Sequence, residues 1–363
     1  MKILFDIGHP AHVHLIRNSY FELLKRKHFV LVTVKDIPSA KQLLDLYGIE
    51  YIELGSKNDS IFQKGIAQLK YNWKVLQLVR KHKIDIGIGS SITIAHISKI
   101  SSMHSIILDD DDDEVEPLFV KYAHPFANVL LSPDVLKGKR KKKDTIYYPG
   151  YHELAYLHPN NFEPDKTVLD ELEIDENTKF FIMRFNVFKA HHDVGIKGLS
   201  LDQKLELVKI LEPHGKIFIT TEREIEPELR QYQMKVSPEK AHSLLNYATM
   251  FLGDSQTMTS EAAVLGVPSV RCNSFAGRIA YLEEEEHKYG LTYGYLPDDF
   301  GKLKLKVKEM ISNKNLKSEW LSKKDNMLKD KIDVSEFLVW FVENYPKSKN
   351  AIKEDDNFQF NLK

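Results

Sequence analysis

Short apolar runs alternate with longer amphipathic runs in this sequence, and the alternation occurs twice along the chain. In the first third, strands are predicted for the runs KILFDIG, FVLVTV, EYIEL, DIGIGS, HSIILD and ANVLLSP. Between them, segments such as residues 12–27 and 61–83 carry apolar residues three to four positions apart, which predicts amphipathic helices. Strands that alternate with helices form parallel sheets covered by helices, so an α/β domain is predicted.

The pattern breaks at residues 148–165, where YPGYHELAYLHPNNFEPD contains three prolines. It then resumes with KFFIMRF, KIFITT, MFLGD, PSVRC and LTYGYL as predicted strands. Because 363 residues exceed one ordinary core, we predict two doubly wound domains, residues 1–160 and 161–346, followed by a polar, frayed tail at 347–363. The last helix, near DVSEFLVWFVENY, is a candidate to pack across the boundary. Ligands of such sheets bind beyond the carboxyl ends of the strands, so a central cleft between the domains is expected.

The composition excludes several classes of protein. A formal net charge of -1 gives no electrostatic basis for a nucleic-acid partner. The single cysteine, Cys272, allows no internal disulfide and no cysteine metal cluster, which fits a reducing compartment. Asp6 and the following histidines interrupt the first apolar run before a signal-peptide core could form, and no run approaches the roughly 20 apolar residues of a membrane span. We therefore expect a cytoplasmic protein with at most peripheral contact with the inner face of a membrane.

Two charged runs have two interpretations each. The basic run KGKRKKK at residues 137–143 is a solvated loop or a weak contact with an anionic membrane surface. The acidic run DDDDDE at residues 109–114 follows a predicted strand and is either solvated or partly in a functional site.

The segment GDSQTMTSEAAVLGVPS, at residues 253–269, has the strongest functional pattern. A buried strand ends, a short polar turn follows and an alanine-rich helix begins, so backbone N–H groups and the positive end of the helix dipole are presented for an anion. The residues of this predicted diphosphate site are Gly253, Asp254, Ser255, Gln256 and Thr257. Glu261, one turn into the helix, could accept both hydroxyls of a ribose. The alternative is a capped helix with Ser255 or Thr257 as N-cap and Glu261 as a favourable charge.

This segment resembles the second-domain signature of GT-B nucleotide-sugar enzymes, especially MurG-type N-acetylglucosaminyltransferases and non-hydrolysing UDP-N-acetylglucosamine 2-epimerases. The resemblance implies that Gly253, Asp254 and Ser255 form the phosphate loop and that Glu261 binds ribose. Gln256 and Thr257 stand where the epimerase pattern has two glycines. It also implies that the residues before the phosphate strand, around Val236 and Ser237, hold the nucleobase, whereas His242 is interpreted as a surface or packing residue.

Over most of its length the chain is identified as a member of the DUF354 family, whose proteins are regarded as GT-B-like. The matching segments are FDIGHPAHVHLIRN, the acidic triplet after the fifth strand, HPFANVLLSP, GYHELAYLHP, MRFNVFKAHHDVG and GDSQTMTSEAAVLGVPSV. Membership implies the GT-B architecture, with two Rossmann-like domains, but no particular reaction.

Further candidates lie in the loops that follow strands. His12, followed by Val13, is similar to the GGHV turn of MurG-type enzymes and is our predicted general base, with His9 and His14 as alternatives. Arg184 and Asn186 are predicted to hold the donor diphosphate, and the alternative for Arg184 is a structural pair with Asp193.

In the acidic run, Asp112 and Glu114 align with the family's triplet and are predicted to orient an acceptor hydroxyl or to share base catalysis with His12. Their carboxylates could also bind a divalent ion, but GT-B catalysis does not usually require one, so we expect no metal site.

The resemblance implies a glycosyltransferase that uses a nucleotide-sugar donor, a UDP-sugar in particular, in the synthesis of cell-surface polysaccharide or glycoconjugate. The nucleotide sugar is then a substrate, no cofactor is expected, and the acceptor is undefined, with a lipid-linked acceptor as one option. The alternatives are an epimerase or hydrolase that acts on UDP-N-acetylglucosamine, and a non-catalytic nucleotide-sugar-binding protein.

Overall fold

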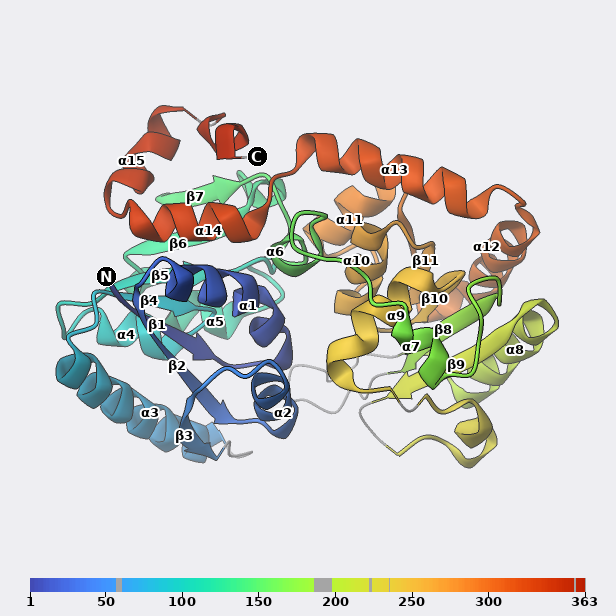
Figure 1. Cartoon of the computed structure of the whole chain (residues 1–363), viewed down its shortest axis with the longest axis horizontal. Coiled ribbons are helices and arrows are strands. Elements are labelled where there is room, and N and C mark those ends of the chain that lie inside the picture. The colour runs from blue at the N-terminus through green and yellow to red at the C-terminus, as the bar shows by residue number, and fades with distance from the viewer. Residues whose placement is uncertain (57–60, 186–197, 222–223, 235, 356, 363) are drawn as a thin grey trace. The chain divides into compact units, whose positions relative to one another are not determined.

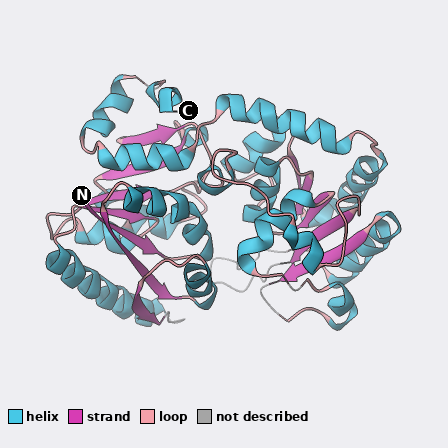
Figure 2. Ribbon diagram, viewed as in Figure 1, coloured by secondary structure: helices cyan, strands magenta, loops and turns pink. Residues whose placement is uncertain are grey.

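The computed structural model describes the chain except for residues 57–60, 186–197, 222–223, 235, 356 and 363. The described residues form two compact units (Figure 1). The first comprises Met1–Asn161 and Lys331–Lys363, and the second comprises Phe162–Asp330. Each unit is a parallel sheet flanked by helices, as Figure 2 shows, so the expected pair of α/β, Rossmann-like domains is confirmed.

The first unit contains a seven-stranded parallel sheet with the order β3-β2-β1-β4-β5-β6-β7. Its strands are β1 (Lys2–Ile7), β2 (Phe29–Asp36), β3 (Ile52–Ser56), β4 (Ile86–Gly89), β5 (His104–Leu108), β6 (Val129–Pro133) and β7 (Thr145–Tyr148). Every residue of β4 and β6 is buried, because helices cover both faces of a parallel sheet. The sequence predicted all of these strands except β7, whose four residues directly precede the proline-rich boundary and are too few to show a periodic pattern.

Three of the helices in this unit begin at a proline, whose fixed φ and missing N–H suit the first helical position. The helices before the boundary are α1 (Pro10–Lys25), α2 (Pro38–Leu46), α3 (Ile61–His82), α4 (Ile92–Ile97), α5 (Pro117–Tyr122) and α6 (Leu154–Leu157), with 3-10 turns at η1 (His124–Phe126) and η2 (Asp134–Leu136). At the start of α1, Nδ1 of His9 accepts a hydrogen bond from the amide of Ala11 at 3.2 Å.

The C-terminal segment belongs to the first unit, which corrects two predictions. We placed residues 331–346 in the second domain and expected a frayed tail after them, but α14 (Val334–Glu343), α15 (Lys347–Glu354) and η8 (Phe358–Leu362) all pack with the first unit. The reason is that α14 is apolar on most of its sides, with Phe337 and Phe341 fully buried, and packs against α1 and α6. The tail is docked through the buried Ile352 of α15.

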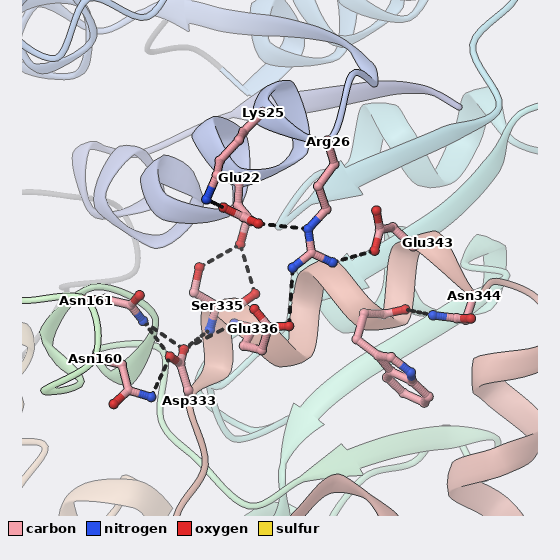
Figure 3. Close-up of polar contacts among 12 residues, drawn as sticks. Glu22, Lys25, Arg26, Asn160, Asn161, Asp333, Ser335, Glu336, Glu343 and Asn344 are labelled. Atoms are coloured by element: carbon pink, nitrogen blue, oxygen red, sulfur yellow. Dashed lines mark hydrogen bonds and ion pairs between the residues drawn. The ribbon is translucent and has the colours of Figure 1, made fainter. Parts of the chain in front are cut away.

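Polar contacts accompany this packing of α14 on α1, as Figure 3 shows. The guanidinium of Arg26 lies 2.8 Å from Glu22 and 2.7 Å from Glu343. Asp333 caps α14 and accepts a hydrogen bond from Nδ2 of Asn161 at 2.8 Å. Partly exposed ion pairs contribute about 0–1 kcal/mol each, whereas burial of one phenylalanine contributes about 1.5–3 kcal/mol, so apolar packing dominates the attachment of α14.

The second unit contains a five-stranded parallel sheet with the order β12-β11-β10-β8-β9. Its strands, all predicted from the sequence, are β8 (Phe180–Phe185), β9 (Lys216–Thr221), β10 (Met250–Gly253), β11 (Ser269–Cys272) and β12 (Thr292–Tyr295). Its helices are α7 (Thr167–Glu171), α8 (Leu201–Leu211), α9 (Ala241–Tyr247), α10 (Gln256–Leu265), α11 (Ala280–His287), α12 (Phe300–Ser312) and α13 (Leu316–Asp330), with 3-10 turns at η4 (Glu212–His214), η5 (Pro227–Tyr232), η6 (Pro238–Lys240) and η7 (Pro297–Asp299). Among the helices of the described residues, none combines the length and the apolar composition needed to cross a bilayer.

Candidate functional site

In the second unit, β10 ends at Gly253, directly beside Arg184 of β8 in the sheet register. A Cβ atom on Gly253 would overlap the carbonyl oxygen of Arg184 and would lie 3.1 Å from both its carbonyl carbon and its amide nitrogen. The amide of Asp254 donates to the same carbonyl oxygen at 3.1 Å. Glycine is therefore required at position 253 by the close approach of two strands.

The polar turn after Gly253 leads into the N-terminus of α10. Ser255 is the N-cap, and its Oγ accepts a hydrogen bond from the amide of Met258 at 3.3 Å. The next two residues, Gln256 and Thr257, are partly exposed, and within the described part of the chain their amides donate no hydrogen bond. The capping interpretation of Ser255 therefore holds, and two N–H groups at the positive end of the helix dipole remain for an anion.

Arg184, the predicted phosphate clamp, lies near the carboxyl end of β8 and is partly buried. Its Nη1 donates a hydrogen bond to Oγ1 of Thr220 on β9 at 3.1 Å. Thr220 therefore helps to orient the guanidinium at the edge of the sheet where α10 begins. Asn186 and Asp193 lie outside the described residues.

The predicted ribose ligand, Glu261, is buried within α10. One of its carboxylate oxygens, Oε1, lies 2.9 Å from Nε2 of His242 on α9, and the two side chains are only 7% and 8% exposed. His242 is thus a buried partner of Glu261 and not a surface residue. A buried carboxylate needs such a partner, and His242 fixes the position of Glu261.

Asn273, which the sequence did not single out, supports the turn before α10. It is fully buried after β11, and its Nδ2 donates to the carbonyl oxygen of Asp254 at 2.8 Å. Its Oδ1 accepts from the amide of Phe275 at 2.9 Å. An asparagine after a strand is typical of a turn, but the sequence alone cannot show which backbone group its side chain holds.

In the first unit, the ring of His12 lies in the first turn of α1. The amide of Gly8 donates a hydrogen bond to Nδ1 of His12 at 3.3 Å, so the neutral ring carries its proton on Nε2. Burial, together with the positive charge of nearby His9 and His152, lowers the pKa of His12 to about 3. At neutral pH this side chain is therefore an uncharged hydrogen-bond donor at Nε2.

The lowered pKa of His12 predicts an acid sensitivity of the fold. Its ordinary pKa is 6.5, so below that pH the unfolded chain takes up a proton that the folded chain does not bind until about pH 3. Stability is then lost as the pH falls between these values, by up to about 1.4 kcal/mol per pH unit. His12→Asn, which keeps an acceptor for the Gly8 amide, should retain about 2 kcal/mol more of its neutral-pH stability at pH 5 than the wild type does. Urea titrations at pH 7 and pH 5 measure this difference, and equal losses in both proteins would contradict it.

Near His12, the side chains of Asp110 and His152 form a pair. Nδ1 of His152 lies 3.0 Å from Oδ2 of Asp110, while Nε2 of His152 is buried with no hydrogen-bond partner among the described residues. Burial raises the pKa of Asp110, but the charge and hydrogen bond of His152 outweigh this effect and lower it. A carboxylate that holds Nδ1–H of a histidine leaves Nε2 as a proton acceptor, which is the arrangement of a general base.

Asp112 and Glu114, the predicted acidic site residues, differ in their exposure. Glu114 is exposed and Asp112 is partly buried, whereas Asp110 is the carboxylate whose charge acts on His12. After β5 the chain turns, with the amide of Val115 donating to the carbonyl oxygen of Asp112 at 2.8 Å.

The two charged runs are partly folded against each other. Arg140, from the basic run, is buried, and its Nη1 lies 2.8 Å from Oδ1 of Asp113. Its Nε donates to Oγ of Ser132 at 3.0 Å. Asp109 is likewise buried and lies 2.7 Å from Nε2 of His124. Neither run is solvated along its whole length, because the buried members of each are paired charges.

Asp109, Asp110 and Asp111 each place a carboxylate oxygen within 4.8 Å of the others, which is close enough to hold a cation. Burial and the charges of Asp110 and Asp109 raise the pKa of Asp111 well above its ordinary value. Arg140 lies 3.2 Å from Asp109, so the chain itself supplies a positive charge to this group.

Comparison with known protein families shows to which family the chain belongs. The model of a family described as "Protein of unknown function (DUF354)" matches residues 1–280. The chain belongs to the DUF354 family. An uncharacterized protein of Methanocaldococcus jannaschii is 21% identical over 333 residues, which cover 83% of this chain and 92% of that protein.

Solved structures similar to this DUF354 protein include UDP-N-acetylglucosamine 2-epimerases and glycosyltransferases. A putative UDP-N-acetylglucosamine 2-epimerase from Listeria monocytogenes has a TM-score of 0.68 and 12% identity, over 95% of this chain and 96% of that one. MnaA of S. aureus, solved with UDP, has a TM-score of 0.64 and 12% identity, over 100% of this chain and 98% of that one. The glycosyltransferase SsfS6 of Streptomyces sp. SF2575, solved with thymidine diphosphate, has a TM-score of 0.59 and 11% identity, over 94% and 99%. At these identities the similarity confirms the GT-B type of fold and does not establish the reaction.

Proposed function

We propose that this DUF354 protein is a glycosyltransferase-like enzyme whose second unit binds a nucleotide-sugar donor by its diphosphate. The observation that supports this proposal most strongly is the start of α10, where the amides of Gln256 and Thr257 make no hydrogen bond within the described residues. Arg184 neighbours Gly253 in the sheet, and we assign its guanidinium to the same anion. UDP is the nucleotide that we favour, since MnaA of S. aureus, which has a similar fold, was solved with UDP.

In the proposed reaction, an acceptor hydroxyl oxygen forms a bond to the anomeric carbon of the sugar while the bond from that carbon to the diphosphate oxygen breaks. Within the first unit, the group that we assign to take up the acceptor proton is Nε2 of His152, which Asp110 orients through Nδ1. The leaving diphosphate keeps the electron pair, and its charge is stabilised by the α10 N-terminus and Arg184.

The sequence predicted that His12 is the general base, and we now assign it a different role. Acceptance of a proton at Nε2 would require the tautomer with the proton on Nδ1, which places two N–H groups, those of Gly8 and His12, against each other. We propose that Nε2–H of His12 instead donates a hydrogen bond to a substrate oxygen. Asp112 and Glu114 remain candidates only for the orientation of the acceptor.

An epimerase that acts on UDP-N-acetylglucosamine is the second candidate, and one observation favours it. The structures named as 2-epimerases have TM-scores of 0.65 and 0.68, above the 0.58 and 0.62 of two glycosyltransferases. In that case the Asp110–His152 pair would move a proton of the sugar itself.

Incubation of the protein with UDP-N-acetylglucosamine and no acceptor distinguishes the two reactions. For a transferase we expect the sugar nucleotide to persist, with release of UDP close to the background rate, as followed by proton NMR. Acceptor-independent conversion to a second UDP-sugar would contradict the transferase and support the epimerase. His152→Gln should abolish any conversion that is observed, while UDP binding in the second unit is retained.

A further inference from the structure

The outward side of α3 carries large apolar side chains. Ile66, Leu69 and Trp73 are 43%, 69% and 60% exposed. Their spacing of three and four residues places them in one stripe along the helix. The opposite side of α3 buries Tyr71 and Val75 in the core, so this helix is apolar on two faces and only one of them is covered.

The exposed apolar stripe is connected to α5 and η1 through His96 of α4. Nδ1 of His96 bonds to the side chain of Asn72 at 3.2 Å, its Nε2 bonds to the carbonyl oxygen of Tyr122 at 2.9 Å, and its ring lies 4.9 Å from that of Phe126. Leu118, Tyr122 and Phe126 are themselves 67%, 44% and 38% exposed. We call the six exposed apolar side chains the α3–α5 surface; they are Ile66, Leu69, Trp73, Leu118, Tyr122 and Phe126.

The elements that carry the α3–α5 surface hold basic but no acidic residues, whereas the exposed Glu114 and the partly buried Glu116 directly precede α5. The sequence of α3 contains no aspartate or glutamate, and neither do residues 86–108 or 117–133. The exposed bases on these elements include Lys70, Arg80, Lys81 and Lys121. Because the whole chain has a net charge of -1, this concentration of positive charge is local to one surface.

We propose that the α3–α5 surface binds the face of a membrane that contains anionic lipids. Leucine, isoleucine and phenylalanine side chains would enter the boundary between headgroups and acyl chains, Trp73 and Tyr122 would lie at that boundary, and the bases would meet lipid phosphates. A protein partner with acidic side chains would match the lysines on α3 and α5. It would not require the exposed apolar stripe that these lysines flank. The lipid surface matches both properties at once.

This surface replaces the basic run as the membrane contact. Within residues 137–143, Arg140 is buried against Asp113, and the following Asp144 pairs with Lys349 at 2.7 Å. Arg140 is therefore not an exposed charge of that run, and no large exposed apolar side chain occurs in it. The proposal is independent of the proposed reaction, because lipid binding requires no nucleotide.

Flotation of the full chain with vesicles tests the proposal. We expect the protein to float with phosphatidylcholine vesicles that contain about 30% phosphatidylglycerol and to bind pure phosphatidylcholine at least about tenfold more weakly. The double variant Leu69→Ser, Trp73→Ser should lower binding to the anionic vesicles at least about tenfold. The matched control is Leu305→Ser on α12, since Leu305 is 70% exposed, almost the same as Leu69, and should leave binding unchanged.

Tryptophan emission provides a second readout. Of the three tryptophans, Trp73 is exposed on α3, Trp320 is buried and Trp340 is partly buried on α14, away from the α3–α5 surface in the sequence. Anionic vesicles should therefore shift the emission of the wild type to shorter wavelength and leave that of Trp73→Phe unshifted. Failure of the wild type to float, or flotation of the double variant equal to that of the wild type, would overturn the proposal. So would a protein dimer in solution that the double variant dissociates, because a second copy would then be the partner of this surface.

Discussion

Gly253→Ala is expected to destabilise the second unit by more than about 3 kcal/mol. The added Cβ would overlap the carbonyl oxygen of Arg184 and lie 3.1 Å from its carbonyl carbon, and these are backbone atoms that no rotamer change can move. Relief of the overlap requires separation of β8 from β10, which are neighbours in the middle of the five-stranded sheet. Loss of this pairing would also displace the turn that leads to α10.

Gly301→Ala is the matched control, because Gly301 lies in α12 of the same unit and an added Cβ there meets no atom within 4 Å. That change should be neutral or stabilising by up to about 1 kcal/mol, as expected for alanine in a helix. The free energy of unfolding of the second unit is compared between the two variants by urea titration, with hydrogen exchange of that unit as the readout. Equal stability of both would show that the strands do not approach as closely as described.

The fold was largely predictable because its signals are local. Each predicted strand of the second sheet is an apolar run bounded by turn residues, and the start of α10 is marked by Ser255 after a buried strand. The sequence could not predict which unit α14 packs against, because its apolar faces could be buried in the core of either unit. Only the packing of Phe337 and Phe341 in the first unit decides it.

The candidate site was predictable only in part, for the same physical reason. The residues at the start of α10 follow from a strand, a turn and a cap that are contiguous in the sequence. By contrast, six successive acidic residues contain no periodic signal that separates Asp110 from Glu114. His152 and Arg140 pair with that run from segments about 30 to 40 residues away, through contacts that exist only in the folded sheet.

Gln256→Pro is expected to weaken the binding of UDP at least about tenfold, through loss of one hydrogen bond to a charged group worth about 1.5–3 kcal/mol. Gln256 is the first residue of α10, where proline is the favoured residue and removes only an N–H that makes no bond within the described chain. Ser255, at φ -77° and ψ 124°, already has the conformation that a residue before proline adopts. The helix should therefore stay folded while one anion-binding donor is removed.

Calorimetric titration of UDP into the wild type, Gln256→Ala and Gln256→Pro tests the central claim, that the second unit binds a nucleoside diphosphate at the start of α10. Gln256→Ala loses the side chain but keeps the amide, so it should bind UDP within about threefold of the wild type. Gln256→Pro should bind at least about tenfold more weakly, with an unfolding transition of the second unit similar to that of Gln256→Ala. Equal affinity of the proline and alanine variants, or no binding of UDP by the wild type, would contradict the claim.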